Sequence, residues 1–88
     1  MSPSSAPLFH LFVVADADPV VLIRLIERIQ SLGLLPQHLS ARWLSDDRLS
    51  IELECAGLNE ARIGTLVDRI SQFTTVHSVK WAHMRDTV

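Results

Sequence analysis

The stretches Leu25–Leu32 (LIERIQSL) and Leu66–Phe73 (LVDRISQF) share one pattern of apolar and charged residues, and this repeat decides the fold. Each stretch lies between apolar segments that read as strands, so each is the helix of a βαβ unit. Two right-handed units of this kind in 88 residues leave room for one four-stranded antiparallel sheet with both helices on one face. The repeat therefore predicts an α+β protein of order βαββαβ, a ferredoxin-like sandwich.

The first βαβ unit begins with a strand that is apolar on both sides. Leu8–Ala15 has apolar side chains at odd and even positions, which is typical of a strand in the middle of a sheet. Asp18 followed by Pro19 predicts a helix start, because aspartate caps free N–H groups and proline fits the first helical position. The helix is expected to end at Leu32, with Gly33 in the left-handed conformation behind it. Its expected buried stripe consists of Leu22, Leu25, Ile26, Ile29 and Leu32.

From Leu35 onward apolar and polar residues alternate, which predicts strands with one polar face. The turn at 45–47 separates this strand from a second alternating stretch, Leu49–Cys55, so the two form a hairpin. Asn59 is the expected cap of the second helix, and Val76–His83 is the expected last strand. The apolar side of the first hairpin strand consists of Leu35, Leu39, Ala41 and Trp43, and the buried stripe of the second helix of Ile63, Leu66, Val67, Ile70 and Phe73.

Length and composition indicate a single domain that associates with a second copy of itself or with another protein. We expect one domain over residues 8–83, with a disordered Pro/Ser-rich tail at 1–7 and a short tail at 84–88. Hydrophobic residues make up 48% of the chain and charged residues 20%, which favours at least a homodimer. A net charge of -2 without a Lys/Arg cluster argues against nucleic acid, and no stretch is long enough to span a membrane. The single cysteine, Cys55, fits a reducing cytoplasm.

No residue set in this sequence has the spacing of a catalytic or metal centre. The four histidines lack the arrangement of known metal motifs, so we expect neither a metal nor another cofactor. Cys55 lies on the apolar side of its strand and reads as a small core residue. Glu52 and Glu54 lack the apolar pocket that an acid/base pair needs, and they favour a solvated or partner-facing strand. The sequence therefore predicts a protein that is not an enzyme.

Several of these features together resemble the ACT domain family. Within that family the chain most resembles the short regulatory subunits of acetolactate synthase, the thiamine-diphosphate enzyme that opens branched-chain amino-acid biosynthesis. The stretch Leu49–Cys55 (LSIELEC) is similar to the third strand of those subunits, and the total length is nearly the same. The resemblance covers residues 9–81. The other residues that carry it are Asp16, Asp18, Pro19 and Leu22 at the start of the first helix, Gly33 behind it, and Val76 and Val79 near the end.

This resemblance implies a non-catalytic chain that dimerises, binds the large catalytic subunit of acetolactate synthase and raises its activity. The expected partner surface is the outward face of the hairpin with the adjoining strand edges. A second interpretation stays open, in which the chain is a free-standing homodimeric sensor of amino acids. The candidate partner residues are His38, Arg42, Glu52 and Glu54.

The resemblance also implies a branched-chain amino acid as ligand, bound at a dimer interface by the loop before the first helix. Two departures weaken that site. Pro19-Val20 stands where the family usually has Pro-Gly, so a side chain fills space that glycine leaves to the ligand. Leu35 stands where effector-binding subunits carry Asn, and it cannot hydrogen-bond a ligand. The candidate effector residues, in a degenerate site, are Asp16, Asp18, Pro19, Val20, Leu34 and Leu35.

The charges of the same loop weaken the site further. Asp18 is expected to occupy the free N–H groups of the first helix as its cap, and Asp16 adds a second negative charge. Both carboxylates repel the carboxylate of an amino acid. We therefore expect feedback control by valine to be weak or absent.

Overall fold

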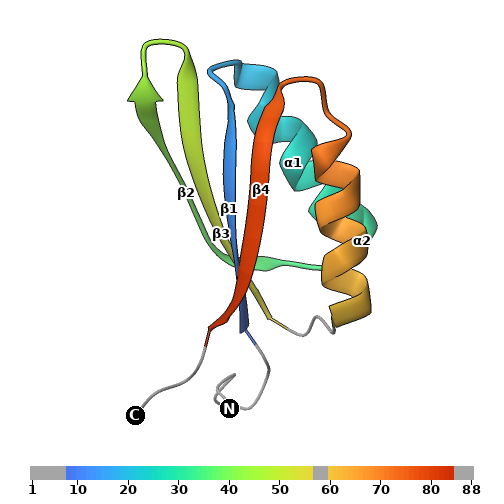
Figure 1. The fold of residues 1–88 in the computed structure, drawn as a ribbon. Helices are drawn as coiled ribbons and strands as arrows, with labels where there is room; N and C mark the ends of the chain where they lie inside the picture. Colours follow the sequence, from blue (N-terminus) through green and yellow to red (C-terminus); the bar gives the residue numbers. More distant parts are fainter. Residues whose placement is uncertain (1–7, 57–59, 85–88) are drawn as a thin grey trace.

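The computed structural model describes residues 8–56 and 60–84 and shows the expected order of strands and helices (Figure 1). Four strands form one antiparallel sheet in the order β2-β3-β1-β4, and both helices lie on one face of it. The ferredoxin-like α+β prediction is confirmed. The elements are β1 (Leu8–Asp16), α1 (Pro19–Ser31), β2 (Pro36–Ser45), β3 (Arg48–Ala56), α2 (Glu60–Ser71) and β4 (Val76–Met84).

The start of α1 follows the predicted capping chemistry. Asp18 is the N-cap, and its Oδ1 accepts a hydrogen bond from the backbone N–H of Val20 at 3.0 Å. Pro19 occupies the first helical position, where its missing N–H costs no hydrogen bond. At the other end Gly33 has a φ of 73°, the left-handed value that favours glycine. The predicted cap of α2, Asn59, and the predicted tail at 1–7 lie outside the described residues. Of the predicted tail at 84–88, Met84 belongs to β4 and residues 85–88 lie outside the described residues.

The register of the sheet decides which side chains share a face. Leu11 of β1 lies between Leu53 of β3 and Trp81 of β4, whereas Phe12 lies between Glu52 and Lys80. At the end of the sheet, Leu8 pairs with Met84 across β1 and β4. The helices cover the first of these faces. The buried core there consists of Phe9, Leu11, Val13 and Ala15 of β1, Ile51, Leu53 and Cys55 of β3, Val21, Leu25 and Ile29 of α1, and Ile63, Leu66 and Ile70 of α2.

The buried stripe of α1 differs from the predicted one at two positions. Ile26 was expected in the core, but its side chain is 42% exposed, and Val21 is buried in its place. Leu22 and Leu32 are only partly buried. The buried side chains of α1 share one core cluster with β1, β3 and α2, whereas Ile26 lies on the exposed flank of the helix. Neither helix is long and apolar enough to cross a membrane, within the residues that the structure describes.

The main surprise of the fold is β2. Its apolar side was expected to face the core, yet nine of its ten residues are exposed, and only Pro36 is partly buried. The reason is its place in the sheet, because β2 is the edge strand next to β3 and extends past the area that the helices cover (Figure 1). Both faces of this strand are therefore open.

Candidate functional site

The structure divides the candidate effector residues into two groups at opposite ends of α1. Asp16, Asp18, Pro19 and Val20 lie together in and after the β1–α1 loop, whereas Leu34 and Leu35 follow the helix. The first group lies at the start of α1 and the second group behind its end, and this helix of 13 residues is about 20 Å long. A single chain therefore does not assemble the site that the resemblance implies.

The carboxylates of the β1–α1 loop already have partners within the chain. Asp18 caps α1, as described above, and this agrees with its predicted structural role. Oδ1 of Asp16 lies 2.6 Å from Nε2 of His77 at the start of β4. The loop is also tied to the hairpin, because the N–H of Ala17 donates to the carbonyl of Asp47 at 2.9 Å. These contacts hold the loop between β4 and the hairpin turn.

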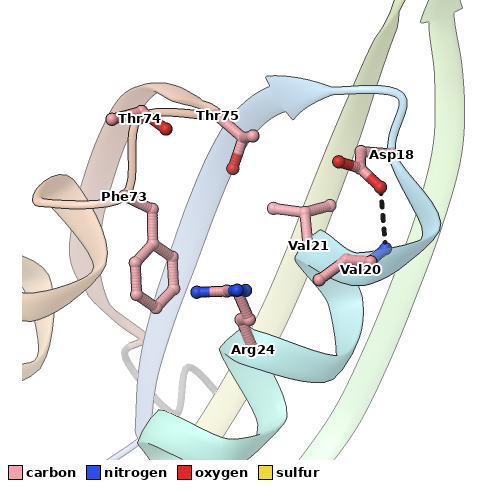
Figure 2. Close-up of a pocket in the computed structure, with 7 residues that line it drawn as sticks. All are labelled: Asp18, Val20, Val21, Arg24, Phe73, Thr74 and Thr75. Atoms are coloured by element: carbon pink, nitrogen blue, oxygen red, sulfur yellow. Dashed lines mark hydrogen bonds between the residues drawn. The ribbon is translucent and has the colours of Figure 1, made fainter.

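A cavity of about 340 Å³ opens on the other flank of the α1 start, toward α2 (Figure 2). Arg24 extends from α1 toward the ring of Phe73, and Asp18 lies at the opposite end (Figure 2). This cavity is not predictable from the sequence, because Arg24 and the Phe73–Thr75 segment are far apart in the chain and match no motif. The cavity is lined by Asp18, Val20, Val21, Arg24, Phe73, Thr74 and Thr75.

The cavity continues along α1 into a smaller hollow of about 150 Å³, lined by Arg24, Glu27, Arg28 and Phe73. The guanidinium carbon of Arg28 lies 5.6 Å from the centre of the Phe73 ring, within the range of a cation–π contact. Arg28 is thus occupied by the ring, whereas Arg24 has no hydrogen-bond or ion-pair partner among the described residues. Arg24 is the available cation of this groove.

The four candidate partner residues do lie on one surface, the open face of the sheet. His38 pairs with Glu54 in the β2–β3 register, and Arg42 pairs with Ser50 beside Glu52. The surface continues onto β1, where Nε2 of His10 lies 3.3 Å from Oε1 of Glu52. Basic side chains of β1 and β2 lie beside the acidic side chains of β3 on this face. The apolar side chain at its centre, that of Phe12, is 40% exposed. The open face is therefore polar with an apolar centre.

A second surface is apolar and exposed, and it includes the side of β2 and the residue Ile26 that were predicted to face the core. Trp43 is 67% exposed and Leu39 is 39% exposed on the helix side of β2. On α1, Arg24 and Arg28 face α2, so helical periodicity places Ile23 and Ile26 on the flank that faces away from it. We call Ile23, Ile26, Leu35, Leu39 and Trp43 the apolar flank.

The residues with catalytic potential show no catalytic arrangement. Cys55 is fully buried, and burial raises the pKa of its thiol above the ordinary value of 9.0, which disfavours the reactive thiolate. No group of three or more His, Cys, Asp or Glu side chains gathers as a metal site in the described part of the chain.

Comparisons with known proteins agree with this picture of the fold. The C-terminal domain of the MgtC protein from Mycobacterium tuberculosis is similar to it with a TM-score of 0.77 and 16% identity, over 92% of this chain and 90% of that one. The ACT domain of GTP pyrophosphokinase from Chlorobium tepidum gives 0.75 and 14%, over 88% and 99%. The regulatory subunit of aspartate kinase from Thermus thermophilus gives 0.69 and 4%, over 86% and 50%.

At these identities the likeness shows the fold alone. None of the curated proteins matches the sequence. A family model described as an ACT-like domain, however, matches residues 4–88, nearly the whole chain. The chain therefore belongs to the ACT-like domain family.

Proposed function

We propose that this chain is a non-catalytic accessory subunit that dimerises and activates a larger enzyme. The observation that carries the proposal is the exposure of β2 on both faces, including the exposed side chains of Leu39 and Trp43 on its helix side. A long edge strand with exposed apolar side chains is unfavourable in a free monomer, since its unpaired N–H and C=O groups and its apolar surface invite association. The surface therefore supports a binding role.

The first partner is a second copy of the chain, paired antiparallel along β2. A two-fold axis at Ala41 places Leu39 opposite Trp43 of the second copy, an aliphatic–aromatic pair of the kind that stabilises sheets. The same axis brings the two copies of Ile23 and Ile26 toward each other over the joined sheet. In this dimer the apolar flank of each copy covers that of the other copy.

The second partner is the catalytic enzyme, and its docking surface is the open face with His38, Arg42, Glu52 and Glu54. This face lies on the side of the sheet away from the helices, so edge pairing leaves it free and extends it across both copies. Its alternating charges suit a specific, partly polar interface. The catalytic subunit of acetolactate synthase is the candidate that the sequence resemblance names, and the reaction is the first step of branched-chain amino-acid biosynthesis.

Co-purification with rate measurement tests this function. Tagged protein should recover the large subunit of acetolactate synthase from an extract of its own source, and adding the pure protein should raise that enzyme's rate. The double variant Glu52→Lys/Glu54→Lys should lose both effects, while Glu27→Lys on α1, away from the open face, should keep them. Recovery of no large subunit, together with an unchanged rate, would refute the proposal.

A free-standing amino-acid sensor is the alternative, and one contact favours it. The β1–α1 loop is bonded to the hairpin turn through Ala17 and Asp47. Antiparallel pairing about Ala41 brings Leu35 of the second copy opposite Asp47, so the dimer joins the two halves of the effector site. Micromolar binding of valine, leucine or isoleucine by calorimetry would support the sensor. We expect no such binding, because Val20 and Leu35 replace the residues that hold a ligand there.

A further inference from the structure

We propose that the open face of the sheet packs against the open face of a second copy of the chain, so that two sheets stack. This contact is separate from the edge pairing along β2, and the argument for it does not use the proposed accessory function. The open face is also the proposed docking surface for the enzyme, so a stacked copy and the enzyme exclude each other. The stack is therefore the enzyme-free form of the chain.

The centre of the open face is apolar and partly exposed. Phe12 lies in the middle of β1 and is 40% exposed, although β1 is a central strand of the sheet. Its ring is stacked on the ring of His10, with 4.4 Å between the two ring centres. Strand alternation places the partly buried Leu8 and Val14 on the same face. A second sheet has the shape that covers such a strip along its whole length.

The area of the face is sufficient for a stable contact. Four strands at a spacing of about 4.8 Å give a width of about 19 Å, and nine or ten residues in each strand give a length of about 30 Å. The footprint is therefore about 570 Å² on each copy, or about 1,100 Å² in total, above the roughly 1,000 Å² that a specific interface needs. Edge pairing along β2 would double this area, because two copies then face two.

Charge selects one of the two symmetric ways to overlay all four strands. If the two-fold axis runs perpendicular to the strands, each strand faces its own copy. Full overlap then places Glu52 over Glu52 and Lys80 over Lys80, since these two residues lie at the same level of the sheet. Like charges that face each other are costly. The favoured axis therefore runs parallel to the strands, above the boundary between β3 and β1.

This axis places unlike charges opposite each other. Each residue of β3 faces, on the other copy, the β1 residue with which it pairs in its own sheet. Glu54 thus faces His10, and Arg48 faces Asp16. The remaining facing pairs are Ser50 with Val14, Ala56 with Leu8 and Glu52 with Phe12, and between β2 and β4 they are Arg42 with Ser78, Ser40 with Lys80 and His38 with Ala82.

The sizes of the facing side chains also agree with stacking. Packed sheets lie about 10 Å apart, a gap that two long side chains such as those of Glu54 and His10 span together. The basic side chains of Arg42 and Lys80 each face a serine, which leaves room for them. Most of these pairs are polar and lose water on contact, so the dissociation constant should be only about 10 µM.

Sedimentation of the full-length chain at about 100 µM tests the stack with two charge variants. Glu54→Arg removes the acid that faces His10, and His10→Glu places an acid opposite Glu54. Each variant alone should associate at least about tenfold more weakly and form assemblies with half as many chains as wild type, whether or not β2 also pairs. Glu27→Lys on α1 is the matched control and should sediment as wild type.

An equimolar mixture of the two variants is the decisive measurement. The new arginine of one variant faces the new glutamate of the other, while the remaining Glu54 faces the remaining His10. The mixture should therefore regain the wild-type mass. A defect within one chain, edge pairing and a perpendicular axis do not produce this recovery. Equal masses for wild type and both variants, or a mixture that stays at half the mass, would overturn the proposal, and neither result depends on an enzyme partner.

Discussion

His77 and Asp16 lie 61 residues apart in the sequence, yet Nε2 of the one is 2.6 Å from Oδ1 of the other. The pair joins the start of β4 to the end of β1 at the β1–α1 loop. Both side chains are substantially exposed, so the interaction is screened by solvent. His77→Gln should lower the free energy of unfolding by no more than about 1 kcal/mol. Urea denaturation measures this, and a loss of several kcal/mol would show that the pair organises the loop.

The cap of α1 should contribute more than this exposed pair. Asp18→Ala removes the acceptor of the Val20 N–H and should cost about 1 kcal/mol of stability. Asp18→Asn keeps an acceptor oxygen and should cost at most a few tenths of a kcal/mol. Equal losses for the two variants in urea unfolding would mean that the charge, not the cap, is what Asp18 contributes.

The glycines at 33 and 64 should respond in opposite directions to alanine. Gly64 lies inside α2 with nothing within 4 Å of an added Cβ, so Gly64→Ala should stabilise the protein by roughly 0.5–1 kcal/mol. Gly33 has equal space but a φ of 73°, so Gly33→Ala should destabilise it by about 1–2 kcal/mol. Thermal melting of the two variants gives the signs, and a stabilising Gly33→Ala would contradict the left-handed cap.

A cysteine on the proposed two-fold axis should crosslink with itself. In antiparallel pairing about Ala41 the two Cα atoms of this residue lie about 4.5–5.5 Å apart, within disulfide range. Ala41→Cys should therefore form a covalent dimer under mild oxidation. The native Cys55 is buried and should not interfere.

The control places the cysteine four residues off the axis. Gln37→Cys would put its two copies about 27 Å apart and should remain uncrosslinked. Equal crosslinking of both variants, or none for Ala41→Cys at micromolar concentration, would exclude this register.

The buried thiol predicts a pH dependence at the alkaline end. The pKa of Cys55 is higher in the folded chain than the ordinary 9.0, so the unfolded chain loses its thiol proton first as the pH rises. This contribution to stability is complete below pH 9 and falls as the pH rises toward the folded pKa. The difference in stability between wild type and Cys55→Ala should shrink over that interval. A thiol reagent should label the native protein at pH 8 only after urea is added.

The order of elements was predictable because its signals are local. Asp18, Pro19 and Gly33 mark the ends of α1 by capping chemistry, and the alternation in β3 shows which side chains share a face. Alternation does not show whether anything covers that face. The exposure of Trp43 and Ile26 depends on where the helices sit across the sheet, and no short stretch of sequence contains that information.

The candidate sites were predictable to a similar extent. The open-face residues His38 and Glu54 were correctly placed on one surface, because strand pairing follows from the hairpin. The cavity with Arg24 was missed, since it forms only when the segment before β4 folds back onto α1. The predicted repulsion of a carboxylate at the β1–α1 loop was based on Asp16 and Asp18 alone, whereas the neighbouring cavity also contains Arg24.

The pairing of Leu8 with Met84 puts the two ends of the described fold side by side, at the end of the sheet opposite the hairpin turn. A domain whose two ends lie together tolerates changes in how it is connected to other chain segments. It can be spliced into a longer polypeptide, or circularly permuted through a short linker, without displacing β2 from its outer position. Whatever covalent setting this module occupies, the edge strand β2 and the cavity beside the start of α1 lie away from the junction.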